Sequence, residues 1–235
     1  MTSATIMTGK AGMTKAKPTR SDRRMVRNRK ALLIAAEKLI AEKGFERVTI
    51  DEIAETADLA KGTFYNYFND KNEIAKELAL TIRRELAAEV GIAEEGIEDP
   101  AGKLVAGIAV FLRAAASSPA HAAVVARMYS LWLRPEANAN FRLLKDLENG
   151  YRDGRFSAGD LQVGIVLTVG VVQAGIMRAL DLAEWDAIRK LALELSEAVL
   201  RALGIRGREP HSIAAKVVAR VFNDRKFEGI ARRGS

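Results

Sequence analysis

The stretch Thr49–Phe68 reads TIDEIAETADLAKGTFYNYF, and it decides the fold. Thr49 is a favourable helix N-cap, and Glu52 three residues later completes a capping box. Apolar residues then recur at helical spacing, at positions 50, 53, 54 and 57. Asp58-Leu59-Ala60 separates this helix of about two turns from a second one, expected over Lys61–Phe68. Two short helices joined by a three-residue turn have the spacing of a helix-turn-helix.

The surface expected for the second of these helices is unusual. Phe64 and Phe68 are four residues apart, so both should face the core. The remaining positions carry a cation, hydroxyl groups, an amide and a glycine: Lys61, Gly62, Thr63, Tyr65, Asn66 and Tyr67. Such groups suit phosphates and base edges, whereas an ordinary solvated helix would more often carry Glu, Lys and Ala. The pattern favours contact with DNA.

The rest of the chain also has helical periodicity. A helix is expected from Arg27 to Gly44 and a fourth one from Asn69-Asp70 to about Gly91. Longer helices are expected near 99–117, 119–133, 138–153, 157–182 and 184–203, and a further one near 211–222. No strand-like alternation persists. The sequence therefore predicts an all-α fold, with an N-terminal three-helix helix-turn-helix domain followed by a helical-bundle domain.

Composition excludes several classes of protein. The 235 residues include no cysteine and only two histidines, His121 and His211, which removes disulfides, cysteine metal sites and most nucleophile–base arrangements. No G-x-S-x-G, P-loop or G-x-G-x-x-G motif is present. The carboxylates lie on amphipathic helices, where solvated faces explain them. We therefore expect no enzyme, no cofactor and no metal.

Charge is unevenly distributed along the chain. Residues 1–30 carry nine Lys/Arg and one acid, and residues 204–235 carry eight Lys/Arg and three acids, although the whole chain is only +7. We expect a disordered basic tail over 1–24, a helix-turn-helix domain over 25–72, a helical ligand-binding and dimerisation domain over 73–203, and a basic C-terminal tail over 204–235. Basic tails suit a polyanion, but they could also simply keep the protein soluble.

The N-terminus lacks the apolar run of a signal peptide. Leu161–Met177 is apolar but short for a membrane span and contains Gln162 and Gln173. A helix buried in a soluble bundle explains this stretch better. We therefore expect a cytoplasmic protein with no membrane partner.

The combination of motifs over residues 27–80 resembles the DNA-binding domain of the TetR family of regulators. The run consists of Ala35-Ala36, Leu39-Ile40, Gly44-Phe45, Thr49, Ile53-Ala54, Ala57, Lys61–Phe68 and Lys71. The resemblance implies that the third helix enters the major groove of operator DNA. Lys61, Gly62, Thr63 and Asn66 would then approach bases and nearby phosphates, while Thr49, Tyr65, Tyr67 and Lys71 would hold phosphates.

Other roles are open for three of these residues. Thr49 could be a plain N-cap, Tyr65 could pack partly, and Lys71 could be a solvated charge. Two positions depart from the family pattern, because Asp58 stands where glycine is frequent and Ala60 where Ser or Thr often begins the helix. Asp tolerates the left-handed conformation, so the turn should survive, but a cap and one phosphate contact are lost at Ala60.

In the C-terminal half, the resemblance implies a homodimer through the helices near 157–182 and 184–203. The first carries a stripe of small residues, Gly164, Thr168, Val171, Gly175 and Ala179. The second carries an apolar seam of Trp185, Ile188, Ala192, Leu195, Val199 and Ala202. These stripes suit a four-helix interface between two copies, and the alternative is an intrachain core.

The family also implies a pocket for an unknown small-molecule effector. Candidate lining residues are Phe111, Met128, Tyr129, Trp132, Gln173 and Met177, although core packing is the better explanation of each one taken singly. The leading hypothesis is a ligand-responsive repressor that binds a near-palindromic operator as a dimer. The alternatives are a regulator without ligand sensing, which acts constitutively or answers a protein partner, and a nonspecific architectural DNA binder.

Overall fold

The computed structural model describes residues 19–127 and 141–223, and all regular elements in these ranges are helical. The N-terminal part contains α1 (Arg20–Lys43), the 3-10 turn η1 (Phe45–Arg47), α2 (Ile50–Thr56), α3 (Lys61–Tyr65) and α4 (Lys71–Ala93). The C-terminal part contains α5 (Pro100–Ser117), α6 (Pro119–Arg127), α7 (Phe141–Arg152), α8 (Leu161–Leu182), α9 (Trp185–Ala202) and α10 (Glu209–Asn223). The predicted all-α fold class is confirmed.

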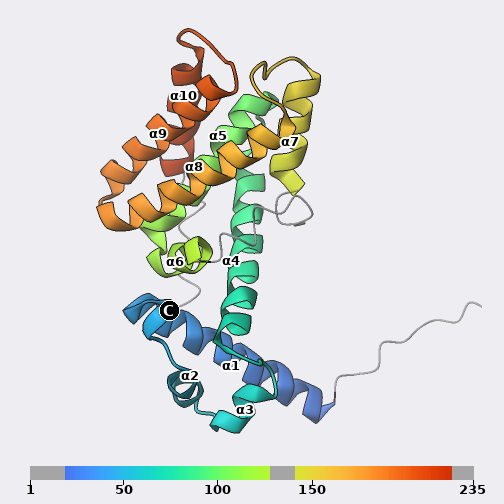
Figure 1. The fold of residues 1–235 in the computed structure, drawn as a ribbon, viewed down its shortest axis with the longest axis vertical. Coiled ribbons are helices and arrows are strands. Elements are labelled where there is room, and N and C mark those ends of the chain that lie inside the picture. Colours follow the sequence, from blue (N-terminus) through green and yellow to red (C-terminus); the bar gives the residue numbers. More distant parts are fainter. Residues whose placement is uncertain (1–18, 128–140, 224–235) are drawn as a thin grey trace, which may run out of the picture.

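The helices form two packed groups joined by α4 (Figure 1). At one end, α1 packs against α2 and α4 and α2 packs against α3, and Leu32, Phe64 and Ile74 of this group are fully buried. At the other end, α5 is the central helix, with most of its residues buried, and α7, α8, α9 and α10 surround it. The helix-turn-helix is thus held at one end of a larger helical domain.

The prediction of a disordered basic tail over residues 1–24 is wrong at the C-terminal end of that range. The first helix begins at Arg20, seven residues before the predicted start, because Thr19 and Asp22 form a capping box. The Asp22 backbone N–H donates to Thr19 Oγ1, and the Thr19 backbone N–H donates to Asp22 Oδ2. Residues 1–18 of that predicted tail lie outside the described residues.

The predicted C-terminal tail over 204–235 contains a structural helix. In α10, the apolar residues Val217, Val218, Val221 and Phe222 are buried against α5 and α9. The Arg155 guanidinium ties the start of this helix to α5, since it donates to Asp99 and to Glu209 at 2.8 Å each. The helix expected near 211–222 is therefore part of the core, and residues 224–235 lie outside the described residues.

The two stripes predicted as a dimer interface pack mainly within the chain. On α8, Gly164 and Gly175 are buried, and a Cβ added to Gly175 would lie 2.9 Å from Leu195 of α9 and 3.3 Å from Leu112 of α5. Small residues there allow α8 to approach its own neighbours closely. On α9, Ile188, Ala192 and Val199 of the predicted seam are buried as well. For these faces the intrachain alternative is the correct one.

The opposite face of α8 is apolar and exposed. Val163, Val166 and Met177 have 53%, 57% and 58% of their surface exposed, and Ala174 lies between them at helical spacing. Two helices, α5 and α8, are long and apolar enough to cross a membrane, but α5 is 67% buried in the fold and α8 is 39% buried. The core position of α5 explains its apolar sequence, whereas the outer face of α8 has no cover within the described residues.

A cluster of charged side chains joins the two groups of helices. His121 on α6 is hydrogen-bonded to Glu37 on α1, while Glu85 and Glu89 of α4 lie near enough to act on its charge. Arg113 of α5 forms a buried ion pair with Glu89. The hydrogen bond with Glu37 raises the pKa of His121 above its ordinary value, and the nearby carboxylates act in the same direction against desolvation.

This junction predicts a pH dependence of stability. A raised pKa in the folded state stabilises the protein below the unfolded pKa of His, about 6.5, and the gain is lost as pH rises through the folded pKa. We expect the urea concentration at the unfolding midpoint to decrease from about pH 6 to about pH 8. The decrease should be larger for the wild type than for His121→Gln, which keeps an amide but cannot titrate. His211→Gln, at an exposed histidine, is the matched control, and equal pH profiles for wild type and His121→Gln would contradict the prediction.

Candidate DNA-binding site

The third helix of the helix-turn-helix is positioned by two aromatic side chains. Phe64 is fully buried and Phe68 is 2% exposed, with their ring centroids 5.7 Å apart. The Arg29 guanidinium of α1 lies 5.3 Å from the Phe68 ring centroid and pairs with Glu77 of α4. Because α3 has only five residues, this packing rather than intrinsic helix propensity fixes its orientation.

The turn between α2 and α3 has the predicted chemistry. Thr49 caps α2, and its capping box with Glu52 is complete. The hydrogen bond from Lys43, followed by those from Thr49, lowers the pKa of Glu52 to about 2, so the carboxylate stays ionised. Asp58 has φ 55°, the left-handed conformation expected at this position. Ala60 makes no side-chain cap, also as expected.

The candidate recognition surface is the solvent-facing side of α3 and of the turn that follows it. The helix is shorter than predicted and ends at Tyr65, after which Phe68 N–H bonds back to the Phe64 carbonyl. Tyr65 is 50% exposed, and Gly62 and Asn66 are also exposed, whereas Thr63 and Tyr67 are half-buried. A Cβ on Gly62 would meet no atom within 4 Å, so its backbone is open to an approaching ligand.

Lys61, the cation of this surface, is held by Asp51 of α2. Its ammonium lies 2.7 Å from Asp51 Oδ1 and 3.1 Å from Oδ2. Hydrogen bonding and Coulombic attraction to Asp51 raise the pKa of Lys61. Both side chains are more than half exposed, so the pair is weak and exchangeable. Asp51 was not among the predicted site residues, because ten positions separate it from Lys61 and only the folded helix-turn-helix brings the two together.

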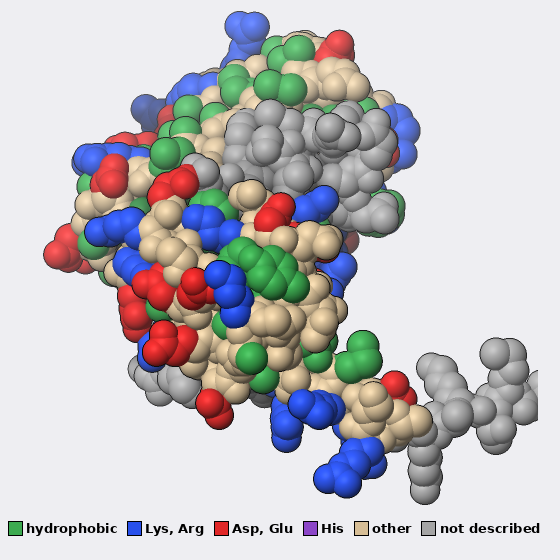
Figure 2. Space-filling model, turned by 60° about the horizontal axis from the view of Figure 1, so that its bottom comes forward, with side chains coloured by type: hydrophobic (Ala, Val, Ile, Leu, Met, Phe, Trp, Pro, Cys, Tyr) green, Lys and Arg blue, Asp and Glu red, His purple; other side chains and the backbone are tan. Residues whose placement is uncertain are grey.

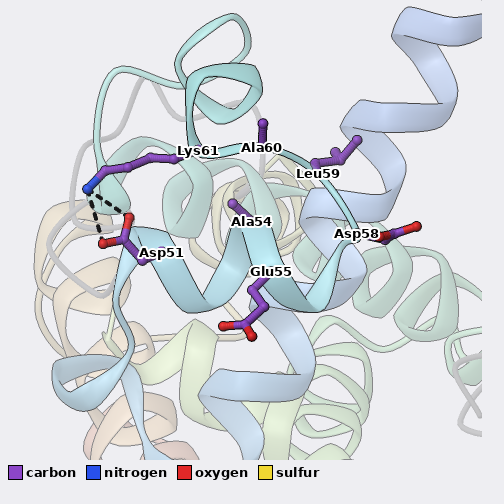
Figure 3. Close-up of a pocket in the computed structure, with 7 residues that line it drawn as sticks. All are labelled: Asp51, Ala54, Glu55, Asp58, Leu59, Ala60 and Lys61. Atoms are coloured by element: carbon purple, nitrogen blue, oxygen red, sulfur yellow. Dashed lines mark hydrogen bonds and ion pairs between the residues drawn. The ribbon is translucent and has the colours of Figure 1, made fainter.

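The Lys61–Asp51 pair forms one wall of an open groove of about 570 Å³ between α2 and the start of α3 (Figure 3). The lining residues are Asp51, Ala54, Glu55, Asp58, Leu59, Ala60 and Lys61. Three of the seven are carboxylates and one is a cation. This side of the helix-turn-helix is therefore unfavourable for a polyanion.

Two predicted phosphate contacts already have partners inside the protein. Lys71 donates to the carbonyls of Phe45 and Glu46 at 3.1 and 3.2 Å, and its ammonium lies 4.6 Å from the Phe45 ring centroid. Thr49 Oγ1 donates to Glu52 at 2.8 Å. Lys71 is therefore more than the solvated charge considered as its alternative, because it fastens the start of α4 to η1. The structure brings Lys61, Gly62, Tyr65 and Asn66 together on the outer surface.

The predicted effector residues do not form one cluster within the described residues. Phe111 is half-buried, with the Arg83 guanidinium 5.6 Å from its ring centroid. The Gln173 amide donates to the Ala126 carbonyl of α6 at 2.6 Å, whereas Met177 is 58% exposed on the outer face of α8. Met177 was therefore wrongly placed as a lining residue inside one chain. The other candidates, Met128, Tyr129 and Trp132, lie outside the described residues.

Comparison with protein families matches both parts of the chain. Residues 32–78 match the model described as "Bacterial regulatory proteins, tetR family". Residues 99–216 match the model described as "Tetracyclin repressor-like, C-terminal domain". The first match covers the helix-turn-helix, and the second extends from the N-terminus of α5 into α10.

Individual relatives support the same assignment. The uncharacterized HTH-type transcriptional regulator YdeS of Bacillus subtilis is 42% identical over 52 residues, 22% of this chain and 26% of that protein. The HTH-type transcriptional regulator EthR of Mycolicibacterium smegmatis is 28% identical over 123 residues, 52% of this chain and 54% of that protein. The chain thus spans between a quarter and about half of the length of these curated relatives.

Solved structures are similar over most of the chain. A crystal structure of RolR in complex with resorcinol has a TM-score of 0.62 and 25% identity, covering 83% of this chain and 96% of RolR. The fatty acid degradation regulator FadR of Bacillus halodurans has the same fold, with a TM-score of 0.58, 21% identity and coverage of 77% and 97%. Since family models match both the helix-turn-helix and more than half of the rest, the chain belongs to the TetR family of bacterial regulatory proteins.

Proposed function

We propose that the protein is a ligand-responsive transcriptional repressor in the cytoplasm, which binds a near-palindromic operator as a homodimer. The exposed surface of α3 is the observation that carries this proposal. A cation, three hydroxyl-bearing side chains, an amide and an open glycine are gathered there without a packing role for Lys61, Gly62 or Asn66. In a major groove, Lys61, Gly62, Thr63 and Asn66 would approach bases.

Phosphate contacts would orient the domain on the duplex. Tyr65 and Tyr67 would reach the DNA backbone with their hydroxyl groups. Thr49 can offer the backbone N–H groups at the start of α2, although its hydroxyl is already part of the capping box. Lys71 would contribute mainly by fixing the end of the recognition surface, because its ammonium is bound to η1.

The dimer would form through the outer face of α8 rather than through the stripes inferred from the sequence. Val163, Val166, Ala174 and Met177 provide an apolar strip along this helix, and burying it against a second copy would remove it from water. The exposed side of α9 is largely charged, with Arg189, Lys190 and Glu194 outward, so that helix would border the interface. A two-fold axis at α8 would relate the two copies of α3 in the dimer to each other.

The effector would be a small organic molecule bound in the C-terminal domain. Two observations support this: the domain resembles RolR, which was solved with resorcinol, and polar groups lie on its interior helices, including the Arg113–Glu89 pair. A bound molecule would shift the population between dimers with different spacing of α3. No contact within the described residues favours the alternative, which is a regulator without ligand sensing.

Selection of bound duplexes from a random pool tests the proposed function directly. We expect a near-palindrome with half-sites about one helical turn apart, ~34–36 Å. Lys61→Ala should weaken binding to that site by about 1–3 kcal/mol, since a base or phosphate contact is lost. Its circular dichroism and thermal midpoint should match the wild type, because Lys61 is exposed. Enrichment of no sequence at all would contradict the function.

Removal of the Asp51 carboxylate should have the opposite effect. Asp51→Asn frees Lys61 and removes a negative charge that borders the proposed recognition surface, so we expect operator binding to tighten by about two- to five-fold, the scale of an exposed ion pair. Glu55→Gln is the matched control, because it removes a carboxylate of the same groove that does not hold Lys61. If both variants tighten binding equally, the loss of a negative charge alone explains the effect, and Asp51 does not restrain Lys61.

The dimer is tested by a charge on the outer face of α8. Val166→Glu should give a folded monomer with strongly weakened operator binding, because two carboxylates would be desolvated near the two-fold axis. Ile34→Glu, at a residue of α1 with similar exposure, should remain a dimer. Light scattering after size-exclusion chromatography measures both, and a dimeric Val166→Glu would place the interface elsewhere.

A further inference from the structure

The first two turns of α1 project from the body of the protein (Figure 1). Every residue from Thr19 to Arg27 is exposed, and the first buried residue of the helix is Asn28. These turns therefore contribute nothing to the hydrophobic core. Their helical form is fixed instead by the Thr19–Asp22 capping box at one end and by the packed remainder of α1 at the other.

The projecting turns carry a continuous basic face. Its residues are Arg20, Arg23, Arg24, Arg27 and Lys30, which follow one another at helical spacings of three, one, three and three residues. All five are exposed, and none forms an ion pair with another residue of the described ranges. Arg29 differs, because it points to the opposite side and pairs with Glu77. The only acid of this segment, Asp22, is engaged at the helix start.

The segment of α1 that carries this basic face lies beside α3. The contact between Arg29 and the Phe68 ring ties the same part of α1 to the turn after α3, and the two elements lie next to each other in Figure 1. When the base of the molecule is turned forward, Lys and Arg side chains gather at the projecting end of α1 (Figure 2). On the other side of α3 lies the groove with the carboxylates of Asp51, Glu55 and Asp58.

We propose that the basic face of α1 is a second, ordered DNA-contact surface that binds the phosphate backbone beside the groove entered by α3. This inference rests on the proposed function and adds a direction to it: the duplex extends from α3 toward the start of α1 and away from the acidic groove. Between Arg20 and Arg27 the helix rises about 10 Å, enough for its arginines to reach more than one phosphate of a strand.

An ordered helix differs from a flexible basic tail in what it can do. A tail collects phosphates without fixed register, whereas cations on one helix face meet a backbone of defined direction. The basic face should therefore strengthen binding to operator and to unrelated duplex alike, since it reads no base edge. Sequence discrimination stays with Lys61, Gly62, Thr63 and Asn66.

The test uses the full chain with three arginines neutralised, Arg20→Gln, Arg23→Gln and Arg27→Gln together. The matched control neutralises Arg206, Arg208 and Lys216 to Gln, three exposed cations of the C-terminal part, so that both variants lose the same charge. Dissociation constants are measured between 50 and 300 mM salt for the selected operator and for an unrelated duplex. Thermal midpoints check the fold, which should be unaffected because the altered side chains are exposed.

We expect the α1 variant to bind both duplexes more weakly at low salt, with the slope of log K against log salt reduced by about 0.9 for every phosphate contact removed. The ratio of operator to unrelated affinity should stay within about two-fold of the wild type. The control should keep the wild-type slope. An α1 variant with the wild-type slope overturns the basic-face proposal while the proposed function stands, whereas failure of the wild type to prefer any duplex overturns the proposed function itself.

Discussion

Burial of Phe64 and Phe68 is the interaction on which the DNA-binding surface depends. A helix of five residues has no stability of its own, so α3 exists as a helix only because these two rings are packed beneath α1, α2 and α4. Once the rings are fixed, the outward direction of Lys61, Gly62, Tyr65 and Asn66 follows from helical geometry. The recognition surface is thus specified by residues that never touch solvent.

Sequence patterns predicted this local architecture well, because its determinants are local. The capping box at Thr49, the left-handed Asp58 and the uncapped Ala60 each depend on neighbours within a few residues. The Asp51–Lys61 pair and the bonds from Lys71 to η1 were missed for the opposite reason. They join residues ten and about twenty-five positions apart, and only the three-dimensional arrangement brings them together.

The C-terminal domain shows what periodicity alone cannot decide. A stripe of small or apolar residues indicates that something packs closely against it, but not whether the neighbour is the same chain or another one. Gly175 faces Leu112 and Leu195, and Ala192 is fully buried in its own domain, while the less obvious strip at Val163, Val166 and Met177 remains exposed. The helix near 211–222 was likewise predicted from its periodicity, but not its packing against α5 and α9.

The unbroken α4 has a geometric consequence for how the two ends of the molecule communicate. Its 23 residues span about 34 Å, from the end of the helix-turn-helix to the base of α5 and α7. A rigid rod of that length converts a tilt of about 5° at one end into a displacement of about 3 Å at the other, close to the rise of one base step along a strand. A rearrangement too small to break any helix in the C-terminal domain is therefore enough to displace α3 by about the length of one base step.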